Sequence, residues 1–377
     1  MVVKGDIRHA YVHVPFCRHR CGYCDFTLVA GRDDLFETFY TALGIELKRL
    51  AQPIELDTLY LGGGTPSHLG PEGIRYLFDV LHDVLRPTSA AEVTIEANPL
   101  DVSEAAIEAF RRCGINRVSL GVQSLNALTL STLDRDHRED DVRRVMPLLL
   151  NSGFTVSVDL IIAAPEQTLD AVGRDLEAIT SLGAQHVSVY CLTWEQGTAF
   201  WGKRARGTLT PVAEDVEHEM FELAIDQLSS SGYQQYEVSN FAQSGMACRH
   251  NEAYWDCQPW EAFGPGAARF DGQNRITNIR STSVWMKNLI GGKGVTGDVD
   301  AMTTEGAARE RLVLGLRRRR GVGRTSFFQQ SGFQVDDLAK KPIQEWVASG
   351  LAEDDGEHVR LTRSGMLLSD SLWSRVL

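Results

Sequence analysis

The first 240 residues alternate short runs rich in β-branched residues with longer amphipathic stretches. Six of the short runs predict strands, at residues 7–16, 56–63, 92–99, 116–123, 155–163 and 186–192. Between them, apolar residues recur at helical spacing, at 34–50, 71–85, 103–113, 140–151 and 169–182. Six successive βα units predict an α/β fold with a mostly parallel sheet, as a partial or complete TIM-type barrel. A doubly wound open sheet is the alternative.

The pattern changes after about residue 200. Residues 211–230 predict one long helix and residues 236–242 an extended segment, whereas the aromatic- and glycine-rich stretch 248–270 predicts irregular structure. From residue 303 onward, helical segments are joined by an alternating piece typical of a wing or hairpin. We therefore predict three parts, namely a core domain 1–235, an extension 236–300 and a small helical and winged C-terminal domain 301–377.

Charge and composition exclude some classes of function. The chain has 38 Lys and Arg against 50 Asp and Glu, a net charge of −12, which is unfavourable for a general polyanion binder, so we expect no nucleic acid partner. The N-terminal residues contain no apolar signal region, and no apolar run is long enough to span a bilayer. These features predict a cytoplasmic protein.

Three of the seven cysteines fall within eight residues. Cys17, Cys21 and Cys24 form a C-x3-C-x2-C array just after the first predicted strand. Three thiolates on one loop can hold three corners of a 4Fe-4S cluster and leave the fourth iron open for another ligand. The spacing leaves two other readings open, a zinc site completed by His13 or His19 and a chance grouping of buried thiols.

The array stands first in an ordered series of motifs. The string YVHVPFCRHRCGYCDF (11–26) is followed by GGGTPS (62–67), TIEANP (94–99), GINRVSLGVQS (114–124), the triplet Leu133, Arg135 and His137, and YEVSNFA (236–242). In order and spacing this series resembles the radical S-adenosylmethionine (SAM) superfamily. Within it, the series is similar to the branch of the oxygen-independent coproporphyrinogen III oxidases (HemN) and the heme chaperones (HemW). The resemblance covers nearly the whole chain.

The resemblance implies a partial (β/α)6 radical SAM barrel, a HemN-type C-terminal domain and two cofactors. A 4Fe-4S cluster would be held by the three clustered cysteines, and SAM would bind the open iron through its amino and carboxylate groups. Electron transfer into SAM would then yield methionine and a 5′-deoxyadenosyl radical. The residues that would surround SAM fall at or near predicted strand ends: Tyr11, Tyr23, Gly63, Gly64, Thr65, Glu96, Gln123, Arg135 and Asp159.

Two features separate the functions of the branch. The oxidase carries a further cysteine two residues after the last cluster cysteine and a long N-terminal extension, whereas this chain has Phe26 there and 16 residues before Cys17. The segment 250–255 is an H-N-x-x-Y-W sequence that resembles the heme chaperone signature, and His250 is the candidate axial ligand of heme iron.

The resemblance therefore favours a heme chaperone that transfers heme to an acceptor protein. It also implies an electron donor such as a flavodoxin or ferredoxin, and leaves a homodimer open. The alternatives are a coproporphyrinogen III dehydrogenase and a radical SAM enzyme that acts on heme itself.

The chain departs from the branch after the fifth predicted strand. Where relatives have Y-G-L-P-G-Q, this chain has Ile162 to Gln167, with Ala163 and Glu166 replacing the glycines and Ala164 the leucine. We expect this to alter the SAM pocket if the glycines allow close approach. Basic residues 317–320 end a predicted helix and suit its dipole. The remaining thiols, without an assigned role, are Cys113, Cys191, Cys248 and Cys257.

Overall fold

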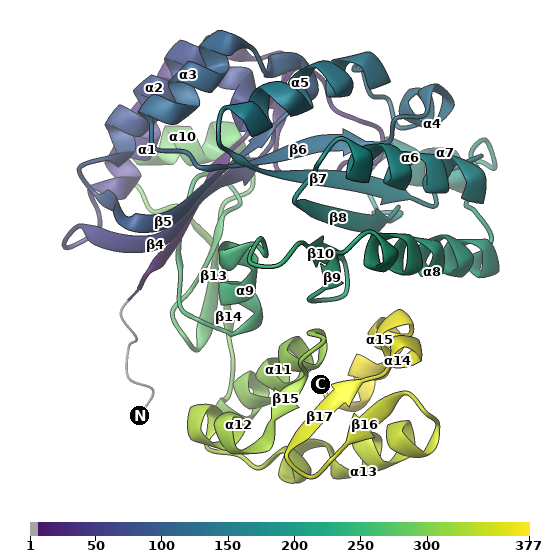
Figure 1. The fold of residues 1–377 in the computed structure, drawn as a ribbon. Coiled ribbons are helices and arrows are strands. Elements are labelled where there is room, and N and C mark those ends of the chain that lie inside the picture. Colours follow the sequence, from purple (N-terminus) through teal and green to yellow (C-terminus); the bar gives the residue numbers. More distant parts are fainter. Residues whose placement is uncertain (1–6) are drawn as a thin grey trace.

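A nine-stranded sheet forms the centre of the molecule in the computed structural model, which describes residues 7–377 (Figure 1). Its parallel strands are, in spatial order, β1 (His9–Val14), β4 (Ile54–Gly63), β5 (Leu85–Ala97), β6 (Arg117–Gln123), β7 (Thr155–Ile162) and β8 (His186–Cys191). β11 (Glu261–Phe263) adds parallel to β1, and β10 (Asn240–Ala242) and β9 (Gln234–Gln235) add antiparallel beyond β8. Within the described chain the two edge strands do not pair, so the predicted α/β partial barrel is confirmed.

The predicted helices connect these strands. They are α1 (Phe36–Leu47), α2 (Gly70–Leu81), α3 (Glu104–Arg112), α5 (Glu139–Asn151), α6 (Leu169–Ser181) and α8 (Glu214–Ser230). Ser103 and Thr168 cap α3 and α6 by accepting backbone N–H bonds. The prediction for α2 was four residues too long, because β5 already begins at Leu85. Two short helices, α4 (Ala127–Thr132) and α7 (Ala199–Ala205), were not predicted.

The inner face of the barrel is polar. Along β6, Val118, Leu120 and Val122 are fully buried, while the alternate residues Arg117 and Ser119 border the barrel cavity. The same alternation places polar side chains on the inner faces of the neighbouring strands: Thr94, Glu96, Ser157, Asp159, His186 and Ser188. Layers of branched aliphatic side chains fill an ordinary TIM barrel. This lumen is instead suited to a polar ligand.

The extension is more ordered than its sequence suggests, so the prediction of irregular structure at 248–270 was wrong. It contains α9 (Arg249–Trp255), β11 and β12 (Ala268–Phe270), and β12 pairs with β13 (Asn274–Asn278), which pairs with β14 (Thr296–Ala301). A helix as short as α9 shows no clear period in a sequence. α10 (Thr282–Ile290) packs Trp285 and Leu289 into the barrel core.

The C-terminal residues form a smaller unit with its own core, drawn below the sheet in Figure 1. Its helices are α11 (Thr304–Leu316), α12 (Arg324–Ser331), α13 (Val335–Ala348), α14 (Arg363–Leu367) and α15 (Ser369–Leu372). The predicted alternating piece is β17 (His358–Leu361), in a small sheet with β15 (Val322–Gly323) and β16 (Ala352–Asp354). The predicted boundary at 235/236 separates β9 from β10, two paired strands, so the three-part division stays a prediction.

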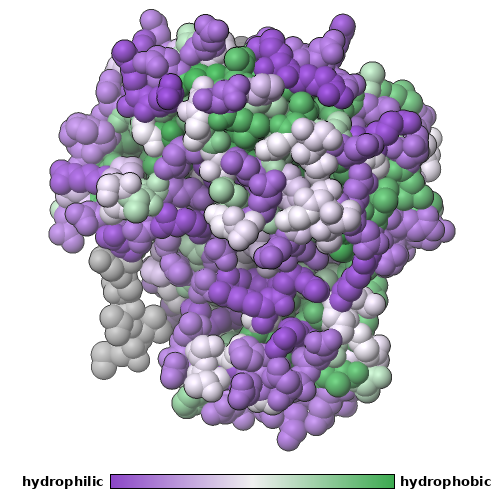
Figure 2. All heavy atoms as spheres, viewed as in Figure 1, coloured by the Kyte–Doolittle hydropathy of each residue, from purple (hydrophilic) through white to green (hydrophobic). Residues whose placement is uncertain are grey.

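Ion pairs join α9 to the C-terminal unit. The guanidinium of Arg318, whose side chain is 3% exposed, pairs with Glu252 at 3.0 Å and with Asp256, and Arg320 also pairs with Asp256. The Arg317 guanidinium lies 5.4 Å from the centre of the Trp255 ring. Figure 2 shows hydrophilic residues gathered across this face between the barrel and the C-terminal unit. The basic run therefore does more than complement a helix dipole.

A buried carboxylate attaches the extension to α1. Glu46 accepts hydrogen bonds from the Gly264 backbone N–H at 2.8 Å and from the Asn278 amide at 2.7 Å. Burial raises the pKa of Glu46 from 4.5 to about 7. The folded protein therefore retains this proton at pH values where the unfolded chain has released it, and stability falls as the pH rises from about 4.5 to above 7.

Replacing Glu46 by glutamine should remove this part of the pH dependence. The loss of stability between pH 5 and pH 8 should be about 2.5 kcal/mol smaller in Glu46→Gln than in the wild type. Urea denaturation of both proteins at the two pH values measures the difference. An equal loss of stability in both proteins would show that Glu46 does not cause it.

Candidate cluster and cofactor site

The cysteine-rich loop has its own backbone scaffold. Cys17 ends β2 (Phe16–Cys17), which pairs in parallel with β3 (Val29–Ala30). Inside the loop, the guanidinium of Arg20 donates to the carbonyls of Cys24, at 3.1 Å, and Leu28, at 3.0 Å. These hydrogen bonds between residues of the loop stabilise its conformation.

Glycine is required between the second and third cysteines of the loop. A Cβ at Gly22 would lie 2.6 Å from the Phe200 ring and 2.6 Å from the Asp134 carboxylate. The Gly22 N–H donates to Asp134 at 3.1 Å, and its carbonyl accepts from the Phe200 N–H at 2.9 Å. The C-G-Y-C backbone is thus packed against the segments that follow β6 and β8.

One cavity of about 500 Å³ collects most of the predicted site. The three cysteines, Cys17, Cys21 and Cys24, border it. So do seven of the ten residues predicted to bind cofactors: Tyr23, Gly64, Thr65, Glu96, Gln123, Arg135 and Asp159. Tyr11, Gly63 and His250 do not border it. Tyr11 lies behind Tyr60, with ring centres 6.1 Å apart.

The chemistry at the cysteine end fits an anionic iron-sulfur cluster. Burial raises the pKa of the Cys17 thiol to about 11 and also raises that of Cys24, so thiolates there need a metal partner. The Arg135 guanidinium approaches Cys21 Sγ at 3.7 Å and donates to the Gly121 carbonyl at 2.8 Å. Its Nε is buried without a partner. Soft sulfur ligands beside a cation suit a 4Fe-4S cluster.

The side chains of residues 7–377 include no group of three or more His, Cys, Asp or Glu placed to hold a metal ion. In a cubane each cysteine binds a different iron, so the three sulfurs stand farther apart than the ligands of a single ion. Zinc would need four ligands about one centre. His13, a proposed zinc ligand, already has Nε2 2.6 Å from the Thr27 carbonyl.

Two buried acids, Glu96 and Asp159, line the cavity. Glu96 accepts from the Tyr60 hydroxyl at 3.1 Å and from the Gly63 N–H at 3.0 Å, and burial together with the nearby Asp159 raises its pKa to about 7. Burial also raises the pKa of Asp159, which accepts from the Ser119 hydroxyl at 3.1 Å. Such acids can accept hydrogen bonds from hydroxyl or ammonium groups of a ligand.

The glycines at the end of β4 are crowded by neighbouring residues of the protein. A Cβ at Gly64 would lie 2.7 Å from the Phe16 carbonyl oxygen, and one at Gly63 would lie 2.5 Å from the His13 ring. These residues are therefore needed to pack the end of β4 against the cluster loop. Gly64 and Thr65 also border the cavity, and Thr65 Oγ1 lies 3.3 Å from Cys17 Sγ.

The departures after β7 lie outside the cavity wall, where Ile161 is the bordering residue. Both replaced glycine positions have left-handed backbone, with φ 58° at Ala163 and φ 65° at Glu166. Side chains in this region cost roughly 1–2 kcal/mol per residue. The chain therefore carries backbone strain here, and Ala163, Ala164 and Glu166 do not border the cavity.

Substituting the exposed Glu166 by glycine should stabilise the protein by about 1 kcal/mol, since relief of strain exceeds the added chain entropy of the unfolded state. Ala163→Gly is the matched comparison and should be close to neutral, because it also removes a buried methyl group worth about 0.8 kcal/mol. Chemical denaturation measures both. A lower free energy of unfolding for Glu166→Gly than for the wild type would contradict the proposed backbone strain at Glu166.

His250 lies at the opposite end of the lumen from the cluster loop. Its Nδ1 is 2.7 Å from the Thr58 hydroxyl on β4, whereas Cys17 contacts Thr65, which lies beyond the end of β4. The imidazole is 2% exposed, and its Nε2 is 2.8 Å from the Tyr254 hydroxyl. Both ring nitrogens are therefore partnered.

These side chains form one continuous series of hydrogen bonds, which fixes the nitrogen that carries the proton in each histidine. Gln258 Oε1 accepts from His9 Nε2, so His9 Nδ1 accepts from the Thr58 hydroxyl. Thr58 then accepts from His250 Nδ1–H, and His250 Nε2 accepts from the Tyr254 hydroxyl. His250 is thus held as the Nδ1–H tautomer, with the lone pair on Nε2.

The remaining cysteines have ordinary surroundings. All are free thiols; Cys248 and Cys257 are buried, and Cys113 and Cys191 are half-buried. Cys191 and Cys248 border the cavity. Burial raises the pKa of Cys248 to about 12.

Comparison with known proteins identifies the family. Residues 11–179 match the radical SAM superfamily, and residues 302–368 match the HemN C-terminal domain. The chain is 33% identical to the heme chaperone HemW of Bacillus subtilis, over 98% of this chain and 99% of that protein. The chain belongs to the HemW family of radical SAM proteins. It is also 32% identical to HemW of Lactococcus lactis, over 98% of this chain and 97% of that one.

The fold of this HemW-family chain is that of a solved radical SAM enzyme. The structure of coproporphyrinogen III oxidase (HemN) from Escherichia coli matches with a TM-score of 0.87, over 100% of this chain and 91% of the other, at 21% identity. At that identity the likeness concerns the fold alone. A 4Fe-4S cluster and SAM are the cofactors of the superfamily, and the cysteine end of the cavity fits them.

The cavity residues of the HemW-family chain that escaped the sequence analysis include Tyr60, Thr94 and Arg117. Their signal is the alternation along predicted strands, where polar residues at every second position mark an inward face. Among residues 7–377, none of the helices combines the length and apolar character needed to cross a bilayer.

Proposed function

We propose that this protein is a heme chaperone, which binds heme and hands it to an acceptor protein. The observation that carries the proposal is its likeness over the full chain to relatives named heme chaperone HemW. The acceptor is a protein with a vacant heme site.

Phe26 supports the chaperone function over the oxidase function. It follows the last cluster cysteine by two positions, its side chain is 61% exposed, and it borders the mouth of the cavity. An exposed aromatic ring offers a flat apolar face to a porphyrin, whereas the cysteine of the oxidase would offer a thiol.

We propose His250 as the axial ligand of heme iron. The Nδ1–H bond to Thr58 leaves Nε2 as the basic nitrogen, the arrangement found where a histidine binds a metal through Nε2. Iron would replace the Tyr254 hydroxyl as the partner of Nε2. Because the imidazole is 2% exposed, α9 must shift from its docked position for heme to reach it.

Removing the Tyr254 hydroxyl tests this assignment. If Nε2 binds heme iron, Tyr254→Phe removes a competitor and should tighten heme binding about threefold or more, because one hydrogen bond is worth about 1 kcal/mol. His250→Ala should shift the Soret band of the heme complex. Heme titration followed by absorbance measures both. An unchanged Soret spectrum in folded His250→Ala and unchanged affinity in Tyr254→Phe would assign His250 a purely structural role.

The oxidase alternative has its own assay. Anaerobic incubation of the cluster-loaded protein with SAM, a reductant and coproporphyrinogen III should leave the substrate unchanged, since Phe26 stands where that enzyme has a cysteine. Formation of protoporphyrinogen IX would overturn the chaperone function. A product of altered mass from heme under the same conditions would instead show a radical enzyme that acts on heme.

We further propose that a low-potential electron carrier, such as a flavodoxin or ferredoxin, reduces the cluster in the cytoplasm. In support, arginines surround the cluster loop and would attract an acidic carrier: Arg20 and Arg280 donate to its backbone carbonyls. A homodimer stays a prediction, which light scattering of the loaded protein would test.

A further inference from the structure

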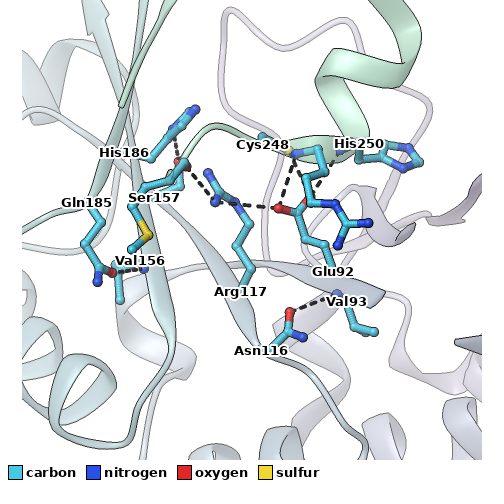
Figure 3. A network of polar contacts seen from close by, with 12 residues as sticks. Glu92, Val93, Asn116, Arg117, Val156, Ser157, Gln185, His186, Cys248 and His250 are labelled. Carbon is cyan, nitrogen blue, oxygen red and sulfur yellow. Dashed lines mark hydrogen bonds and ion pairs between the residues drawn. The ribbon is translucent and has the colours of Figure 1, made fainter. Parts of the chain in front are cut away.

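The end of the barrel lumen near α9 carries polar groups without partners. Arg117 and Thr94 lie side by side on β6 and β5 and both border the cavity. The Nη2 atom of Arg117 and the hydroxyl of Thr94 are buried and have no hydrogen-bond partner. Figure 3 shows Arg117 between Glu92 and Ser157. A buried donor without a partner is costly unless a ligand or water satisfies it.

Arg117 forms an ion pair with one buried carboxylate but makes no hydrogen bond to it. Its side chain is 4% exposed, and its nearest carboxylate, on Glu92, lies 3.8 Å away, outside hydrogen-bond distance. The oxygens of Glu92 are occupied by the backbone N–H groups of Arg249, at 3.2 Å, and His250, at 3.1 Å. Arg117 Nη1 donates to the Met246 carbonyl at 3.0 Å.

The neighbouring polar side chains on β7 and β8 form hydrogen bonds within the protein. Ser157 Oγ lies 2.7 Å from His186 Nδ1, whose Nε2 lies 2.8 Å from the Tyr236 hydroxyl. The groups that face the lumen without partners are therefore a guanidinium N–H and a hydroxyl. Both can donate to the same acceptor, and one of them is charged.

We propose that this end of the lumen binds the carboxylate of a small organic acid, with Arg117 and Thr94 as donors. Arg117 begins β6 and Gln123 ends it, so the site lies toward the end of the cavity away from the cluster loop. The rest of the ligand extends toward the cluster. The site adjoins the predicted SAM residues, since Thr94 precedes Glu96 by two positions on the same face of β5, and it does not rest on the heme function.

Butyrate is the probe, and butyramide, of matched size without charge, is its control. With the cluster-loaded chain in the presence of SAM, saturation-transfer NMR should detect saturable binding of butyrate and at least about tenfold weaker binding of butyramide. Arg117→Met should weaken butyrate binding at least about tenfold. Thr94→Val removes one unpartnered hydroxyl at constant shape and should weaken it about threefold.

Arg174→Met is the matched control, because Arg174 is 63% exposed on α6 and pairs with Asp170. This variant should bind butyrate like the wild type. If Arg117→Met fails to fold, butyrate binding by Thr94→Val and butyramide binding by the wild type still test the proposal. Absence of saturable butyrate binding in the wild type would overturn the proposal. So would equal binding of butyramide, or wild-type binding by folded Thr94→Val and Arg117→Met.

Discussion

Single replacement of Cys17, Cys21 or Cys24 by serine is expected to abolish cluster assembly. After anaerobic reconstitution the wild type should contain about four irons and four sulfides per chain, and each variant should fall close to background. The reason is ligand number, since three thiolates from one loop are the protein ligands and a serine hydroxyl is a poor ligand for iron. SAM binding should be weakened with the cluster, because the open iron is its anchor.

Cys113→Ser is the matched control. This thiol is half-buried after α3 and does not border the cavity, so its variant should load iron like the wild type. Iron and acid-labile sulfide analysis decides the outcome. Full loading in any of the three loop variants would remove that cysteine as a ligand. Zinc without sulfide in the wild type would establish the zinc alternative.

Replacing Arg318 by alanine is expected to release α9 from the C-terminal unit. The side chain is 3% exposed and pairs with Glu252 and Asp256, both on or next to α9. Loss of the Arg318 cation removes the shared partner of two carboxylates that are 37% and 36% exposed, and the cost should be about 1–2 kcal/mol. Urea denaturation measures the loss. Hydrogen exchange of the α9 amides should accelerate, because this segment then keeps its hydrogen bonds to Glu92 and Arg311 but loses both ion pairs to Arg318.

The adjacent Arg319 supplies the control. It is exposed, and Arg319→Ala should change stability by less than about 0.5 kcal/mol. If heme reaches His250 only when α9 shifts, Arg318→Ala should also bind heme faster than Arg319→Ala in stopped-flow mixing. Equal stability of the two variants would contradict the role of Arg318 as a clamp.

The barrel could be predicted because its signal is local. Each strand shows its own alternation of apolar and polar residues, and caps such as Ser103 and Thr168 stand beside the helices that they begin. α9 could not be predicted in the same way. It is short and depends on Glu92, far away in the sequence, for its N-terminal hydrogen bonds. The addition of β11 to β1 likewise depends on tertiary contacts.

The same difference between local signals and tertiary contacts applies to the site. The three cysteines and Glu96 occur in an ordered series of motifs, and they border one cavity. The roles of His250 and the glycines depend on neighbours that only the fold brings together. Gly63 and Gly64 are crowded by His13 and Phe16, and His250 is enclosed by Thr58 and Tyr254. A motif names such residues but does not show which contacts they make.

Heme binding by the cluster-loaded protein tests the central claim most directly. Heme is titrated anaerobically into the full chain after reconstitution with iron, sulfide and SAM, and the Soret band is followed with serum albumin as a reference for unspecific uptake. A heme chaperone should saturate at about one heme per chain and then release that heme to an apoprotein with a vacant heme site. Linear, unsaturable uptake, or saturation without release, would contradict the proposed function.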